Sequence, residues 1–175
     1  MSIAKTLLAE FEEQAPITRR FLERLPEDKL TWKPHDKSMS AGQLAYHLAF
    51  VPGGIIRFVQ NNPAEAPKFA NFPQPASREE ILKTFEESIA AVRTLLPKFG
   101  EAGMQESWRL VADGRDVLVQ SRGEFLRNIM LNHWYQHRGQ FSVYLRILGI
   151  PVPASWGPSA DEPPTFLQKE KAQRA

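Results

Sequence analysis

The strongest helical signal in the chain lies in residues 121–149, SRGEFLRNIMLNHWYQHRGQFSVYLRILG, and it contains two histidines. Ser121 and Glu124 form an S-x-x-E capping box, which is typical of a helix start. Apolar and histidine side chains then recur at steps of three and four, which predicts one helix face: Leu126, Ile129, Met130, His133, His137, Phe141, Tyr144 and Leu148. Gly149 and Pro151 are expected to end the helix, since glycine adopts the left-handed cap and proline cannot continue.

His133 and His137 lie one helical turn apart on the face that should point inward. An isolated H-x-x-x-H pair is more often a hydrogen-bonded pair in the core than a metal site, because short motifs match by chance. The zinc-protease version of this motif places Glu directly after the first His, and here that residue is Trp134. The pair therefore predicts a metal site only if a third ligand lies elsewhere in the chain.

The composition narrows the class of protein. The 175 residues fit one domain, and 22 Lys and Arg against 20 Asp and Glu leave a net charge of only +2. We therefore expect no nucleic-acid partner. The chain has no Cys, which excludes disulfides, thiolate ligands and a Cys nucleophile. The amphipathic, acidic N-terminus does not resemble a signal peptide, and no apolar run approaches the roughly 20 residues of a membrane span. A cytoplasmic location without membrane contact is expected.

Three further helices are predicted upstream, over residues 3–25, 40–60 and 77–96. Ser40 with Gln43 and Ser77 with Glu80 are capping boxes for the second and third. Proline falls within the first pattern at position 16, where it should kink or split the helix. In the second pattern the run Pro52-Gly53-Gly54 indicates a kink, a tight helix contact or an early end.

The connection between the third and fourth helices should contain a short β-hairpin, because Asp113-Gly114 lies between two β-prone runs, residues 108–112 and 117–120. Four amphipathic helices bury their apolar faces most simply against each other, so the fold class predicted is all-α, a four-helix bundle with a long connection between helices 3 and 4. Residues 1–150 would form the bundle. Residues 151–175 would form an extended Pro-rich tail that packs on it or trails from it, through Trp156 and Phe166 if it packs.

A third histidine falls on an inward face. His47 lies three residues after Leu44 and four before Val51 in the second predicted helix, so it too should point into the bundle. A pair at i, i+4 with one residue from a neighbouring helix is a common way to bring three nitrogen ligands together. Three protein ligands with an open fourth position are typical of catalytic sites, and four of structural sites. His35, in a loop next to Pro34, is expected to be a solvated histidine.

Two segments carry a resemblance to a known family. Residues 42–48, GQLAYHL, resemble the second-helix motif of the DinB family, and residues 133–140, HWYQHRGQ, resemble that family's H-x-x-x-H-R-G-Q segment. The resemblance covers roughly residues 1–150. It implies a four-helix bundle that holds a divalent metal ion, zinc or nickel, on His47, His133 and His137. It also implies a homodimer. Some relatives in the wider superfamily are metal-dependent transferases or isomerases that use a low-molecular-weight thiol. The family name refers to damage-inducible expression.

Such a site would acidify a bound water or thiol, and with no Cys in the chain the thiol would have to come from a cosubstrate. The candidates for catalytic roles are Arg138, Gln140 and Tyr144. Arg138 would form a surface or interhelix ion pair or, alternatively, clamp an anionic substrate. Gln140 would orient a metal ligand or cap a backbone group. Tyr144 would belong to the core or an interface, or would donate a proton near the metal.

Three functions stay open at this stage. The first is a metal-dependent enzyme acting on a small molecule, either a thiol-dependent S-transferase or a hydrolase. The second is a non-catalytic dimeric stress-response or ligand-binding protein whose metal is structural. In the third, the histidines are core residues only.

Overall fold

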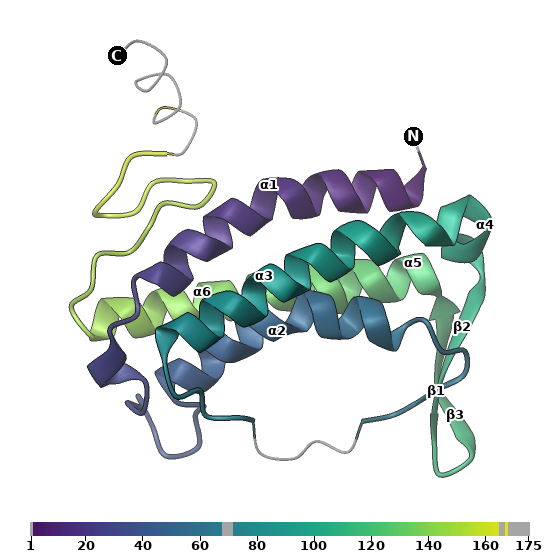
Figure 1. Ribbon diagram of the computed structural model, residues 1–175, viewed down its shortest axis with the longest axis horizontal. Helices are drawn as coiled ribbons and strands as arrows, with labels where there is room; N and C mark the ends of the chain where they lie inside the picture. The colour runs from purple at the N-terminus through teal and green to yellow at the C-terminus, as the bar shows by residue number, and fades with distance from the viewer. Residues whose placement is uncertain (1, 68–71, 165–166, 168–175) are drawn as a thin grey trace.

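The computed structural model describes residues 2–67, 72–164 and 167. Three long helices, α1 (Ile3–Glu23), α2 (Ala41–Phe58) and α3 (Arg78–Leu95), lie beside a fourth helical segment that ends in α6 (His133–Ile147). Their apolar faces meet in one continuous core (Figure 1). A small sheet lies at one end of the bundle, and residues 150–164, which follow α6, lie at the other. The predicted all-α bundle is confirmed.

Neither internal proline ends its helix. α1 continues through Pro16, so the predicted split does not occur, and α2 continues through Pro52 to Phe58. Of the three alternatives for the run Pro52-Gly53-Gly54, the structure shows the tight helix contact. A Cβ added at Gly53 would lie 2.6 Å from Cα of Ser88 in α3. Glycine at this position lets two helix backbones approach closely.

The third connection is more structured than expected. A 3₁₀ turn (Leu96–Phe99) and the short helix α4 (Gly100–Gln105) follow α3. The predicted hairpin is present, as β2 (Ser107–Ala112) paired antiparallel with β3 (Arg115–Ser121). Asp113 and Gly114 both have positive φ, at 49° and 74°, which this tight turn requires. A two-residue strand, β1 (Ala64–Glu65), adds to β2 in parallel and was not predicted.

The segment from Ser121 to Gly149 is not one regular helix. It begins with α5 (Arg122–Phe125), whose predicted capping box forms between Ser121 and Glu124. A π-helix (Leu126–Asn132) follows, and α6 begins directly after it. The wider π turn was not anticipated from a pattern that fits an α-helix. Gly149 ends the segment with φ 72°, as expected.

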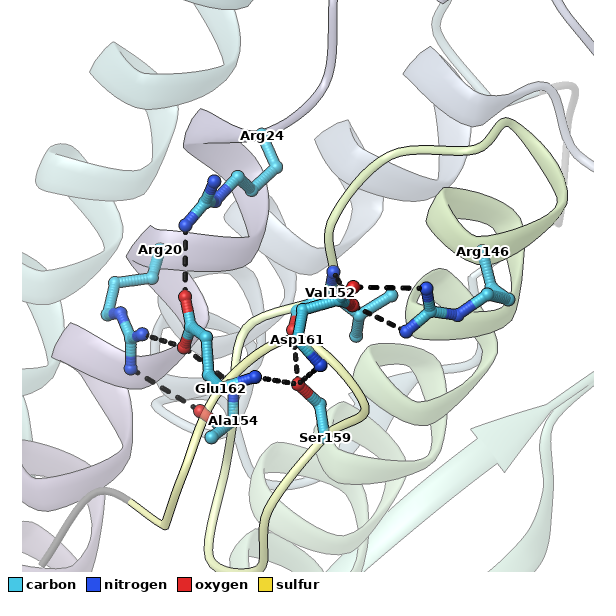
Figure 2. Close-up of polar contacts among 8 residues, drawn as sticks. All are labelled: Arg20, Arg24, Arg146, Val152, Ala154, Ser159, Asp161 and Glu162. Atoms are coloured by element: carbon cyan, nitrogen blue, oxygen red, sulfur yellow. Dashed lines mark hydrogen bonds and ion pairs between the residues drawn. The ribbon is translucent and has the colours of Figure 1, made fainter. Parts of the chain in front are cut away.

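Beyond α6, residues 150–164 form a strap that contacts both α1 and α6, and two adjacent carboxylates hold it (Figure 2). Glu162 pairs with Arg20 and Arg24 of α1, while Asp161 pairs with Arg146 of α6 at 2.5 Å. Within the strap, Ser159 donates a hydrogen bond to the Val152 carbonyl at 2.7 Å. The strap thereby joins the side chains of α1 to residues that follow α6, the last long helix.

The strap packs through other residues than expected. Val152 and Ala154 are buried, whereas the Trp156 side chain is 59% exposed, so packing through Trp156 was wrong. Phe166 lies outside the described residues. Among the helices that the structure describes, none is both long and apolar enough to cross a membrane.

Candidate metal centre

Three histidines meet between α2 and α6. His47 comes from α2, and His133 and His137 come from adjacent turns of α6. One ring nitrogen from each lies within 4.8 Å of the others. The ring centroids are 4.3 Å apart for the pair on α6, and 5.3 and 4.6 Å from His47 to His133 and His137. Each side chain is half-buried. The structure thus brings together the three residues that the sequence predicted.

A buried tryptophan fixes the height of α6 against α2. Trp134 Nε1 donates a hydrogen bond to the Leu48 carbonyl at 2.8 Å. Its indole is 1% exposed and stacks on Phe11 of α1, with ring centroids 5.4 Å apart. Trp134 directly follows His133, and Leu48 directly follows His47. This one bond therefore sets the register that places the two helices' histidines opposite each other.

The π-helix adjoins the site, because its last residue, Asn132, directly precedes His133. Short π segments within α-helices are frequent at functional sites. Nδ1 of His133 is buried and makes no hydrogen bond within the described residues. A buried polar atom without a hydrogen-bond partner has an energetic cost.

Burial keeps the three imidazoles neutral. It lowers the pKa of His47 to about 3, with further lowering by the nearby His137 and His133. The pKa of His133 is lowered by burial and by His137, against the opposing influence of the Ile129 backbone. Burial also lowers the pKa of His137, and its hydrogen bond with Gln140 opposes this. The neutral form is the one that binds metal ions, so the folded chain holds the ligands ready.

Gln140 selects the tautomer of His137. Its Oε1 lies 2.7 Å from Nδ1 of His137, and a carbonyl oxygen there requires Nδ1 to carry the proton. Nε2 of His137 then carries a lone pair, which accepts a hydrogen bond from Nε2 of His133. The predicted role for Gln140, to orient a metal ligand, agrees with this contact.

The donor set fits a divalent ion with a small adjustment. Nε2 of His133 and Nε2 of His137 are 2.7 Å apart, so one donates to the other. Two imidazole nitrogens on one tetrahedral ion, each 2.0–2.1 Å from it, would be about 3.3 Å apart. Opening the pair by about 0.6 Å is within reach of side-chain rotation. Neutral imidazoles suit zinc, nickel, copper and iron alike, so the residues fit a metal without choosing it.

Two other candidate residues lie away from the histidines. The Arg138 guanidinium is buried against α1, where it donates to Gln14 Oε1 at 2.7 Å and to Thr18 Oγ1 at 3.2 Å. Burial lowers its pKa. Arg138 therefore makes a contact between helices, as one of its predicted roles required. Its acceptors are neutral side chains, whereas an ion pair was expected. The Tyr144 hydroxyl donates to the Met39 carbonyl at 3.3 Å.

The loop histidine stays apart from the site. Nδ1 of His35 accepts a hydrogen bond from the Lys37 backbone at 3.1 Å, and the metal-ligand group found among the described residues does not include it. One site residue was missed entirely. The ring of Phe72 meets the ring of His47 edge to face, with centroids 4.9 Å apart. Phe72 lies in a connector with no periodicity, so no signal in the sequence could have placed it there.

Comparison with known proteins agrees with the fold. The chain is 26% identical over 156 residues to the uncharacterized protein YrdA of Bacillus subtilis (strain 168), a match that covers 89% of each chain. A crystal structure of a DinB-like protein from Bacillus cereus ATCC 10987 matches with a TM-score of 0.69 and 20% identity, over 87% of this chain and 97% of that one. The DinB-like protein YjoA from Bacillus subtilis matches with a TM-score of 0.62 and 22% identity, over 85% and 95%. The family model matches residues 1–170, and this chain belongs to the DinB family.

Proposed function

We propose that this protein is a metal-dependent enzyme that acts on a small molecule, as a thiol-dependent S-transferase or as a hydrolase. His47, His133 and His137 would hold a divalent ion, zinc or nickel. The observation that carries the proposal is the convergence of three neutral imidazoles, with no fourth His, Cys, Asp or Glu joining them among the residues that the structure describes. Three protein ligands are the arrangement of catalytic sites, which keep a position for water or substrate.

The bound ion would supply Lewis acidity, which lowers the pKa of a coordinated water or thiol. The chain's own residues supply the rest. Burial keeps the imidazoles neutral, and Gln140 holds the single ring proton of His137 on Nδ1. Because the chain contains no Cys, a thiol nucleophile would come from outside, as a low-molecular-weight cosubstrate. The homodimer, the cytoplasmic location and the damage-inducible expression stay predictions.

The second candidate is a binding protein with a structural metal. The placement of Arg138 and Tyr144 favours this candidate. The polar groups of both side chains form hydrogen bonds away from the histidines, to Gln14 and Thr18 and to the Met39 carbonyl respectively. Of the three residues expected to assist catalysis, only Gln140 reaches the site. The two candidates differ in the coordination shell, which is open in an enzyme and saturated in a structural site.

Metal analysis of protein purified without a nickel column tests the proposal. We expect about one divalent ion per chain, lost in His47→Ala, His133→Ala and His137→Ala and retained in the matched variant His35→Ala. In the cobalt-substituted protein, an added small thiol should produce a sulfur-to-metal charge-transfer band. A saturated shell that no thiol or water enters would favour the structural metal, and protein without any metal would reduce the histidines to core residues.

A further inference from the structure

Phe72 is an exposed aromatic residue whose ring contacts the ring of His47. Phe72 meets the His47 imidazole at an interplanar angle of 79°, yet its side chain remains 38% exposed. The Phe72 ring thus contacts both His47, a candidate metal ligand, and the solvent. An aromatic side chain that only filled the core would be covered, and one with no role beside the site would have no reason to lie against the imidazole.

Polar contacts hold this part of the chain against α2. Gln43 Nε2 donates to the Phe72 carbonyl at 2.9 Å, while Gln43 Oε1 accepts from the Ser40 backbone at 2.9 Å in the capping box. Two residues further along, Gln74 accepts from Ser40 Oγ at 2.6 Å and donates to the Leu30 carbonyl at 3.2 Å. The residues that begin α2 therefore also position the ring beside His47, one turn along the same helix.

The hydrogen bonds and ring contacts of the three imidazoles, among the residues that the structure describes, involve no charged side chain. Within the described residues, their side-chain contacts reach one another, Gln140 and Phe72. A ligand arm that extends from the coordinated atoms past His47 would thus meet the apolar ring of Phe72. Buried aromatic surface favours a second apolar or aromatic group in edge or stacked contact.

We infer that Phe72 is a specificity-determining residue, whose ring forms the apolar wall of the substrate site and selects ligands with an apolar, planar group next to the metal-binding atoms. The inference rests on the proposed metal site and names the class of ligand that site takes. Phe72 is a positioning residue for the ligand and takes no part in holding the ion.

Two hydroxamates that chelate the same ion and differ in one group provide the test. Acetohydroxamate carries a methyl group and benzohydroxamate a phenyl ring, and both are titrated into the cobalt-loaded protein by its visible spectrum. The measured quantity is the ratio of the two dissociation constants. We expect Phe72→Ala to lower the preference for benzohydroxamate by about tenfold, the size of an aromatic contact together with the apolar area it covers. Phe72→Leu, which keeps an apolar wall, should retain most of it.

Controls separate this role from others. Trp156→Ala, which truncates an exposed aromatic side chain on the strap, should leave the ratio unchanged. An unchanged ratio in Phe72→Ala would overturn the inference, including the case in which cobalt affinity falls, since the ring would then only support His47. A change in sedimentation mass with an unchanged ratio would assign the ring to a contact between copies instead. Wild-type protein that takes up no cobalt would refute the proposed function itself, whereas cobalt uptake with an unchanged ratio refutes only the wall.

Discussion

The hydrogen bond between Trp134 and α2 should control both stability and metal affinity. In Trp134→Phe, the Leu48 carbonyl loses its donor inside the core, which costs about 1–3 kcal/mol. The smaller ring also loses packing against Phe11, at a further cost of about 1 kcal/mol. We expect the free energy of unfolding, measured in urea, to fall by about 3 kcal/mol. Metal affinity, measured by calorimetry, should fall about 10–100-fold because the two helices lose their register, an effect of the size seen for residues that orient metal ligands.

Trp108→Phe is the matched control. Trp108 is 0% exposed and donates the same kind of bond, from Nε1 to the Asn61 carbonyl at 2.7 Å. It lies in β2, in the sheet at one end of the bundle. Trp108→Phe should therefore lower the free energy of unfolding about as much as Trp134→Phe does, and it should leave the metal affinity nearly unchanged. If Trp134→Phe behaves in the same way, with a loss of stability and unchanged metal affinity, the register argument is wrong.

Three further outcomes follow from the same contacts. The metal-free protein should lose stability as pH falls below about 6.5. The pKa of His47 is lowered to about 3 in the folded chain, so between these two pH values only the unfolded chain binds a proton there. Urea unfolding at pH 7 and pH 5 measures this loss, and a His47→Leu variant with the same pH dependence would contradict the assignment. Gln140→Leu should weaken metal binding about tenfold with little change in melting temperature, since the tautomer of His137 is no longer selected; equal calorimetric affinities would remove Gln140 from the site. Glu162→Gln should lower the free energy of unfolding by about 1–2 kcal/mol, because two arginines lose a carboxylate, and a urea midpoint equal to that of wild type would make the strap energetically idle.

The three candidate metal ligands could be found from the sequence because they obey helical periodicity. His47 stands at step three from Leu44, and His133 and His137 are separated by four, so each could be assigned to a buried face before the helices were placed together. Capping boxes located the starts of α2 and α5, and Asp113-Gly114 located the hairpin turn. Local chemistry was sufficient for these features.

Other features depend on contacts that no local pattern encodes. The π-helix before His133 changes the hydrogen-bond step while the apolar spacing still fits an α-helix. Arg138 lies next to a candidate ligand in sequence, but its side chain leaves another face of α6 and bonds to α1. Phe72 contacts His47 from a segment, residues 72–76, that hydrogen bonds of Gln43 and Gln74 hold in place. Each of these required the tertiary arrangement.

The strap has a consequence for the order in which the molecule assembles. Arg20 and Glu162 are separated by 142 positions along the chain, so closing this contact demands a very large loop. Such long-range pairs cannot guide early folding and should form only after the four helices have docked. Interactions that are absent from the transition state slow unfolding without speeding folding. The carboxylates of Asp161 and Glu162 would then act mainly on the lifetime of the native state, as a late-closing latch that joins the first helix to the last.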